Sequence, residues 1–128
     1  MHILNNSMNT NFLEKFELIK FSDLLLEGDD IVRPLDSLAL PGFYGIHCFA
    51  TNRTYITHAE NVADLIQYDY TELYYDRFQG SPHLVSDVKK YGLDSLAFVI
   101  IKVGPNWRDL NDRKKECQNI KKSWPSKY

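Results

Sequence analysis

The sequence has little cysteine, no long apolar run and no strong excess of charge of either sign. Two cysteines in 128 residues, Cys48 and Cys117, leave one disulfide formally open, but they favour two buried thiols in a reducing compartment. The longest uninterrupted apolar run, residues 96–101, is far too short to cross a membrane. The first eight residues have no cationic start and no apolar core, so we expect no secretory signal. The length fits a single domain that buries a core.

The formal net charge of −2 hides an uneven distribution along the chain. Residues 1–36 carry a net charge of −4 and residues 37–112 a net charge of −3, whereas residues 113–128 carry +5. Only this C-terminal segment offers a phosphate a favourable electrostatic field. Its basic side chains are either a solvated helix face or a surface for nucleic acid or a partner. The candidates for such a surface are Lys114, Lys115, Lys121, Lys122 and Lys127.

Asn, Ile, Lys and Tyr are all frequent, a mixture that AT-rich codons favour. The composition therefore indicates an organellar or phage genome. Together with the sparse cysteines, it predicts an intracellular, reducing location, which is a plastid or mitochondrion or otherwise the cytoplasm.

A β-hairpin is the clearest local prediction. Two short apolar runs, residues 41–49 and 54–57, flank the polar turn at Ala50–Arg53. One strand carries Tyr44 and the other Tyr55. The pattern alone is satisfied by two aromatic core residues, so any further role depends on the rest of the chain.

Helices and one more strand are predicted around this hairpin. Asn11, Phe12, Phe16 and Ile19 have the spacing of a helix, which places a helical extension at residues 1–40 ahead of a domain at residues 41–128. Further helices are expected after the capping residues Asn61, Ser81 and Asn106, with Gly92 ending the second of them. The apolar run at residues 96–101 predicts a buried strand. The expected fold class is α/β, with a small three-stranded mixed sheet flanked by helices.

Several short motifs resemble those of the GIY-YIG endonuclease family, of the organellar or phage type. They are Gly42-Phe43-Tyr44, Tyr55-Ile56-Thr57, His83-Leu84-x-x-Asp87-x-x-x-Tyr91-Gly92-x-x-x-Leu96-x-Phe98, Arg113-x-x-Glu116, Pro125 and a final tyrosine. The spacing of the two tyrosines and the order of elements are also similar. The resemblance covers residues 40–128 and implies a GIY-YIG-like fold for the domain.

The resemblance implies hydrolysis of a phosphodiester at one divalent metal ion. Tyr44 matches the tyrosine that helps to activate water, and Tyr55 matches the tyrosine that positions it. Glu116 matches the metal-binding glutamate, although a solvated helix charge explains it equally well. An active member would need Mg²⁺ or Mn²⁺. The metal ion would act as a Lewis acid and the tyrosine that activates water as a general base.

The sequence departs from the family pattern at the positions that handle phosphate. Thr57 replaces the glycine of the second motif, and Leu65 replaces the arginine that steadies charge on the phosphate. Asp64 and Asp69 stand where basic residues are typical of the family. Loss of the arginine alone is expected to reduce the rate about a hundredfold. Arg77 is the one nearby replacement, from a neighbouring element.

The whole stretch between the second tyrosine and Arg77 is acidic. Residues 60–76 contain five acidic side chains and no basic one. Each carboxylate within a few ångströms of a phosphate repels it by about 1 kcal/mol even in a watery environment. These residues therefore favour a degenerate site in which Tyr44 and Tyr55 are vestigial.

Three functions stay open at this point. The favoured one is a catalytically impaired GIY-YIG-like protein that needs no cofactor and serves as a structural or adaptor subunit among the proteins of a larger assembly, such as an organellar ribonucleoprotein. The alternative is an active, metal-dependent homing-type DNA endonuclease from a mobile element. The third is a nucleic-acid-binding module that holds RNA or DNA through its basic C-terminus.

Overall fold

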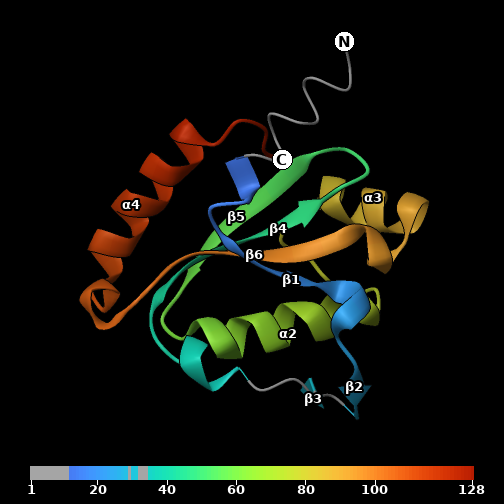
Figure 1. The fold of residues 1–128 in the computed structure, drawn as a ribbon, viewed down its shortest axis with the longest axis horizontal. Helices are drawn as coiled ribbons and strands as arrows, with labels where there is room; N and C mark the ends of the chain where they lie inside the picture. The colour runs from blue at the N-terminus through green and yellow to red at the C-terminus, as the bar shows by residue number, and fades with distance from the viewer. Residues whose placement is uncertain (1–11, 29, 32–34) are drawn as a thin grey trace.

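A four-stranded antiparallel sheet lies at the centre of the computed structural model, which describes residues 12–28, 30–31 and 35–128 (Figure 1). Within this part of the chain the sheet has the order β1-β6-β4-β5. The strands are β1 (Glu17–Lys20), β4 (Gly42–Cys48), β5 (Arg53–Ala59) and β6 (Leu96–Val103). The prediction of an α/β fold is confirmed, but the predicted three-stranded mixed sheet is wrong in both strand number and direction. Every strand pair of this sheet is antiparallel.

The additional strand comes from the segment predicted to be a helical extension. Residues 12–13 are helical, but the chain is extended from Glu17, and Ile19 pairs with Phe98 on β6. The apolar spacing of residues 12–19 fits a helix, yet β6 is buried on both faces and its free edge needs a strand partner. Residues on both sides of position 40 therefore share one sheet. The part of the predicted extension at residues 1–11, 29 and 32–34 lies outside the described residues.

The predicted hairpin forms between β4 and β5. Tyr44 pairs with Thr57 and Ile46 with Tyr55. Asn52 closes the turn with φ 57°, a conformation that asparagine tolerates, and its N–H donates to the carbonyl of Cys48 at 2.8 Å. The last residues of the chain cover part of the outer edge of β5, where Thr54 makes an isolated parallel bridge with Lys127.

Three α-helices are present in the described residues: α2 (Val62–Tyr74), α3 (Pro82–Tyr91) and α4 (Leu110–Ser123). Asn61 caps α2 and Ser81 caps α3, as predicted, each by accepting a backbone N–H three residues on. The predicted cap at Asn106 is wrong, because Asp109 caps α4 through the N–H of Asp112. Asn106 lies instead in a short 3₁₀ turn before the helix.

The two faces of the sheet bury separate clusters. One face carries Tyr44 and Phe98 and packs against α2 and α3. The other face carries Phe43 and Val99 and packs against α4 and the aromatic residues that precede β1. Because neighbouring strand residues point to opposite faces, Phe43 and Tyr44 belong to different clusters. Consequently α4 lies across the sheet from α2 and α3.

Short elements complete the fold. A two-stranded ribbon, β2 (Leu26–Glu27) and β3 (Asp30–Ile31), lies near α2, where the backbone N–H of Ile31 donates to Gln67 Oε1 at 2.7 Å. The 3₁₀ turns are η1 (Phe21–Asp23), η2 (Asp36–Leu38), η3 (Leu93–Ser95) and η4 (Pro105–Trp107). In the described part of the chain, no helix has the length and apolar character needed to span a membrane.

Candidate functional site: an acidic cleft beside Tyr55

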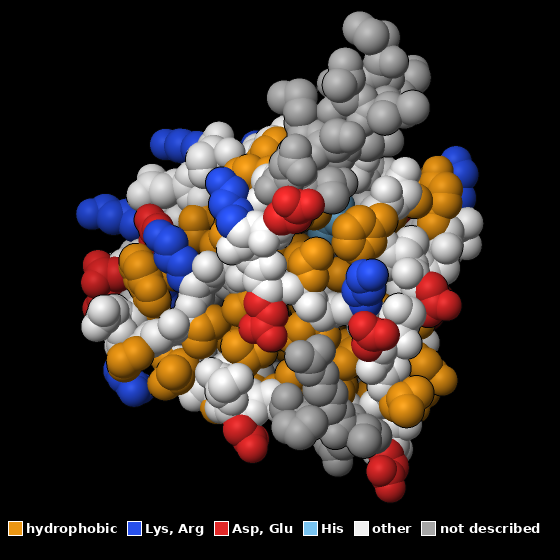
Figure 2. All heavy atoms as spheres, in the orientation of Figure 1, with side chains coloured by type: hydrophobic (Ala, Val, Ile, Leu, Met, Phe, Trp, Pro, Cys, Tyr) orange, Lys and Arg blue, Asp and Glu red, His pale blue; other side chains and the backbone are white. Residues whose placement is uncertain are grey.

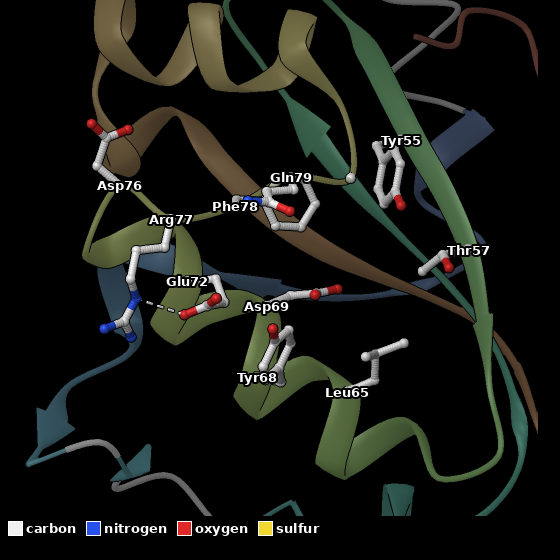
Figure 3. Close-up of a pocket in the computed structure, with 11 residues that line it drawn as sticks. Tyr55, Thr57, Leu65, Tyr68, Asp69, Glu72, Asp76, Arg77, Phe78 and Gln79 are labelled. Atoms are coloured by element: carbon white, nitrogen blue, oxygen red, sulfur yellow. Dashed lines mark hydrogen bonds and ion pairs between the residues drawn. The ribbon is translucent and has the colours of Figure 1, made fainter.

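A cleft lies between β5 and α2, and the segment that leads into α3 closes it (Figure 3). Its volume is about 720 Å³, which is typical of small-molecule sites. It is lined by Tyr55, Thr57, Leu65, Tyr68, Asp69, Glu72, Asp76, Arg77, Phe78, Gln79 and Gly80. The cleft therefore includes Tyr55 and Leu65, the residue that the resemblance matches to an arginine.

Tyr44 lies behind the cleft and does not line it. Its side chain is fully buried, and its hydroxyl donates a short hydrogen bond to Asp69 Oδ2. Burial and the Asp69 carboxylate raise the pKa of Tyr44 well above its usual value. A water molecule in the cleft has no access to this phenol, and the phenol holds its proton tightly. Tyr44 is thus placed to support Asp69, and poorly placed to activate water.

Asp69 is the buried acid of the cleft. It projects from α2 toward β5, and only 6% of its surface is exposed. Burial is the main cause that raises its pKa to about 6; the hydrogen bond from Tyr44 lowers the pKa and the charge of Glu72 raises it. At neutral pH the cleft thus holds a desolvated carboxylate that a single phenol stabilises.

Tyr55 forms one aromatic wall of the cleft. Its ring meets that of Phe78 edge to face, with centroids 5.6 Å apart. Burial and the charge of Asp69 raise the pKa of its hydroxyl. Opposite it, Tyr68 on α2 is 59% exposed and contributes a second aromatic surface.

The only cation among the residues that line the cleft is already engaged. Arg77 Nε donates to Glu72 Oε2 at 2.8 Å, and its guanidinium lies 5.0 Å from the centre of the Tyr75 ring. Since Asp69, Glu72 and Asp76 outnumber Arg77, the cleft is acidic. The acidic stretch was evident from the sequence. That Asp69 would be buried against Tyr44 was not, because the two are 25 residues apart.

Glu116 lies on the opposite face of the sheet from the two tyrosines. It accepts a short hydrogen bond from Lys102 Nζ on β6 and a second from Asn119 Nδ2 at 3.3 Å. These donors, Lys102 first, lower its pKa. The described residues contain no group of three His, Cys, Asp or Glu side chains that could hold a metal ion. Glu116, the residue that the resemblance matches to the metal ligand, is instead paired with Lys102.

The basic residues of the C-terminus line one side of α4 and the tail that follows it. Lys114, Lys115, Lys122 and Lys127 are exposed and Lys121 is half-buried. Several lysine and arginine side chains gather on the left of Figure 2, over α4, with a few acidic side chains among them. Lys121 and Lys127 also line a smaller hollow of about 250 Å³ that adjoins Tyr55.

Arg113 has a structural position within this basic segment. It is buried, and its Nη1 donates to the carbonyls of Trp107 and Arg108 at 3.0 and 2.9 Å. Its Nε donates to His58 Nδ1 on β5 at 3.4 Å. Burial first, and then the charges of Arg113, Lys121 and Lys114, lower the pKa of His58. Arg113 thus links the turn before α4 to the sheet. Glu116, on the same helix, pairs with Lys102 instead.

No family model matches the sequence, and no curated protein and no solved structure matches it. The functional assignment therefore depends on the residues of the site and their geometry.

Proposed function

We propose that this protein is a catalytically impaired, GIY-YIG-like protein that serves as a structural or adaptor subunit of a larger assembly, such as an organellar ribonucleoprotein. The observation that carries the proposal is the charge of the cleft beside Tyr55. A phosphodiester there would meet Asp69, Glu72 and Asp76, and the one arginine is paired with Glu72. Asp76 forms an exposed ion pair with Lys89 at 3.9 Å, whereas Asp69 has no cationic partner among the described residues and opposes phosphate by about 1 kcal/mol or more.

The positions of the other matched residues support the same conclusion. Tyr44 is buried and committed to Asp69, so it is not available as a general base. Glu116 is separated from both tyrosines by the sheet and is neutralised by Lys102. The glutamate that the family chemistry requires beside the two tyrosines therefore lies apart from them.

The contact surfaces of such a subunit are proposed at the charged segments. The exposed lysines of α4 and the tail suit an acidic protein surface or the backbone of RNA or DNA. The buried free thiols Cys48 and Cys117 are consistent with a reducing compartment, which we propose to be a plastid or mitochondrion or otherwise the cytoplasm.

A cleavage assay tests the proposal directly. Purified protein is incubated with supercoiled plasmid and either Mg²⁺ or Mn²⁺, beside a Glu116→Ala variant. We expect no nicking by either protein with either metal. Nicking by the wild type that is lost in the variant would establish the alternative, an active homing-type endonuclease, and overturn the proposal.

A nucleic-acid-binding module is the second candidate, favoured by the side of α4 that carries Lys114 and Lys121 beside β5. It requires an affinity for RNA or DNA that falls steeply with salt, by about one power of the salt concentration for each phosphate contact. Neutralising Lys121 and Lys122 to glutamine would reduce both the affinity and this slope. Unchanged binding in that variant would exclude the basic segment as the contact surface.

A further inference from the structure

The cleft beside Tyr55 has the composition of a site for an organic cation. Tyr55, Tyr68 and Phe78 supply aromatic surfaces, and Asp69 supplies a carboxylate without a cationic partner among the described residues, whereas Glu72, one helical turn on, is already paired with Arg77. Aromatic faces attract cations through the negative face of the ring, most strongly when the cation is desolvated. The volume of about 720 Å³ accommodates an alkyl chain together with its charged group.

Asp69 provides an independent sign of a ligand. It is more than nine-tenths buried, and its only hydrogen-bond donor among the described residues is Tyr44, which bonds Oδ2. No residue of the described chain donates to Oδ1, and the carboxylate is directed into the cleft toward Thr57 (Figure 3). Oδ1 is open to the cleft, where a bound donor of opposite charge can hydrogen-bond to it in place of water.

The geometry distinguishes between classes of ligand. A bare metal ion needs several convergent ligands, and the described residues do not bring three acidic, histidine or cysteine side chains together. An anion would be repelled by the carboxylates. A cation with N–H donors satisfies Asp69, and its flat or alkyl part contacts the aromatic surfaces.

The chain itself shows this mode of contact at the rim of the cleft. The guanidinium of Arg77 bonds Glu72 and lies over the ring of Tyr75. Asp69, Tyr55 and Phe78 also line the cleft, so it combines a carboxylate with aromatic rings as well.

We propose that the cleft binds an alkylammonium or guanidinium group, carried either by a free amine or by a lysine or arginine side chain of a partner protein. The proposal assigns a ligand class to a site that the proposed function leaves without one. It depends on the contacts of Asp69 and not on descent from a nuclease, so the cleavage assay and the binding assay can fail separately.

Titration of the full-length ¹⁵N-labelled protein tests the ligand class. The probes are agmatine as the free amine, acetyl-Gly-Arg-Gly-amide as the side chain, and inorganic phosphate as the anion. We expect saturable shifts of the amides of Thr57, Asp69 and Gln79 with agmatine, with the peptide or with both, and none with phosphate. A response to agmatine alone identifies a free amine as the source, and a response to the peptide identifies a side chain. No response to either below about 10 mM, or a response of these amides to phosphate, would overturn the proposal.

Charge variants test the site. Asp69→Asn keeps the shape of the side chain and removes its charge, and Gln79→Lys places a competing cation at the exposed rim of the cleft. Both are expected to weaken binding of the responding probe about tenfold or more, measured by calorimetry. The matched control Asp64→Asn removes a charge from the exposed first turn of the same helix, outside the cleft, and should change binding by less than about twofold.

Two results of these variants would contradict the proposal: unchanged affinity in a folded Asp69→Asn, or equal losses in Asp69→Asn and Asp64→Asn. If Asp69→Asn does not fold, Gln79→Lys decides the question, because an exposed substitution leaves the core intact. Wild-type affinity in Gln79→Lys would then exclude the cleft as the binding site.

Discussion

Tyr44 and Asp69 form a buried hydrogen-bonded pair that joins the central hairpin to helix α2. The phenol projects from β4 and the carboxylate from α2, so the bond crosses the interface between the sheet and the helix. The phenol that donates to the Asp69 carboxylate is itself removed from solvent. The tyrosine that the resemblance matches to a water activator is here the hydrogen-bond donor to a buried acid.

Tyr44→Phe should destabilise the protein by about 1.5–3 kcal/mol at pH 7. The substitution preserves packing but leaves the buried Asp69 carboxylate without its donor, and it should raise the pKa of Asp69 above about 6. Urea denaturation measures the stability, and ¹³C NMR of the carboxyl group measures the pKa. Tyr70→Phe is the matched control, since the buried Tyr70 hydroxyl donates only at 3.4 Å, to the carbonyl of Leu24. Equal losses of stability in both variants would show that the Tyr44–Asp69 bond contributes no more to stability than the Tyr70–Leu24 bond.

His47 and Asp69 should oppose each other in the dependence of stability on pH. Burial lowers the pKa of His47 to about 4, and among the described residues its Nε2 has no hydrogen-bond partner. The unfolded chain takes up a proton near pH 6.5, so this histidine's contribution is present above pH 6.5 and is lost as the pH falls to about 4. The loss amounts to about 3 kcal/mol.

Asp69 acts in the opposite direction over nearly the same range. Its folded pKa of about 6 lies above the ordinary value of 3.8, so its contribution is present below pH 3.8 and is lost as the pH rises through 6. Asp69→Asn should therefore lose about 3 kcal/mol relative to the wild type between pH 6 and 4, and His47→Gln should gain a similar amount. Denaturation series at several pH values check both slopes. If the free energy of unfolding of the wild type and of either variant changes with pH in parallel, the shifted pKa of that residue is contradicted.

Glu116→Gln should leave the protein nearly as stable as the wild type, with a loss below about 1 kcal/mol. Glu116 and Lys102 form an ion pair whose side chains are 19% and 48% exposed, and such pairs contribute little in water. Because Lys102 occupies the carboxylate, Mn²⁺ should not selectively broaden the NMR signals around Glu116. Glu60→Gln, in an exposed position, is the comparison. Selective broadening at Glu116 that vanishes in Glu116→Gln would contradict this expectation.

Gly42→Ala should destabilise the protein by about 3 kcal/mol, because β6 passes directly over this residue. A Cβ at Gly42 would lie 2.1 Å from the backbone oxygen of Lys102 and 2.8 Å from Val103 Cα, and backbone atoms cannot yield cheaply. At Gly104, a Cβ would meet nothing within 4 Å, so Gly104→Ala should remain within about 1 kcal/mol of the wild type. Thermal unfolding of the two variants side by side is the measurement. A tolerated Gly42→Ala would mean that β4 and β6 separate easily at this end.

Local signals in the sequence were sufficient for much of the fold. The polar turn predicted at residues 50–53 and the alternating runs beside it predicted the hairpin, and the caps Asn61 and Ser81 predicted the starts of two helices. The apolar run at residues 96–101 predicted the buried strand β6. These features depend on turn geometry, capping bonds and side-chain periodicity within a few residues, which the sequence displays directly.

Only the tertiary structure decided the remaining features, because they depend on contacts between distant segments. β1 is a strand and not a helix because the edge of β6, about 80 residues away, pairs with it. The orientation of α4 on its face of the sheet places Glu116 beside Lys102 and away from the tyrosines.

The cleft also combines features that the sequence displays with features that depend on tertiary packing. The sequence by itself determined that the stretch after Tyr55 is acidic and that residue 65 is a leucine, at the position that the resemblance matches to an arginine. That Asp69 is buried, bonded to Tyr44 and open toward an aromatic cleft was decided by the packing of α2 on the sheet. Charge is a property of composition, whereas desolvation and the direction of a side chain arise only when the elements pack together.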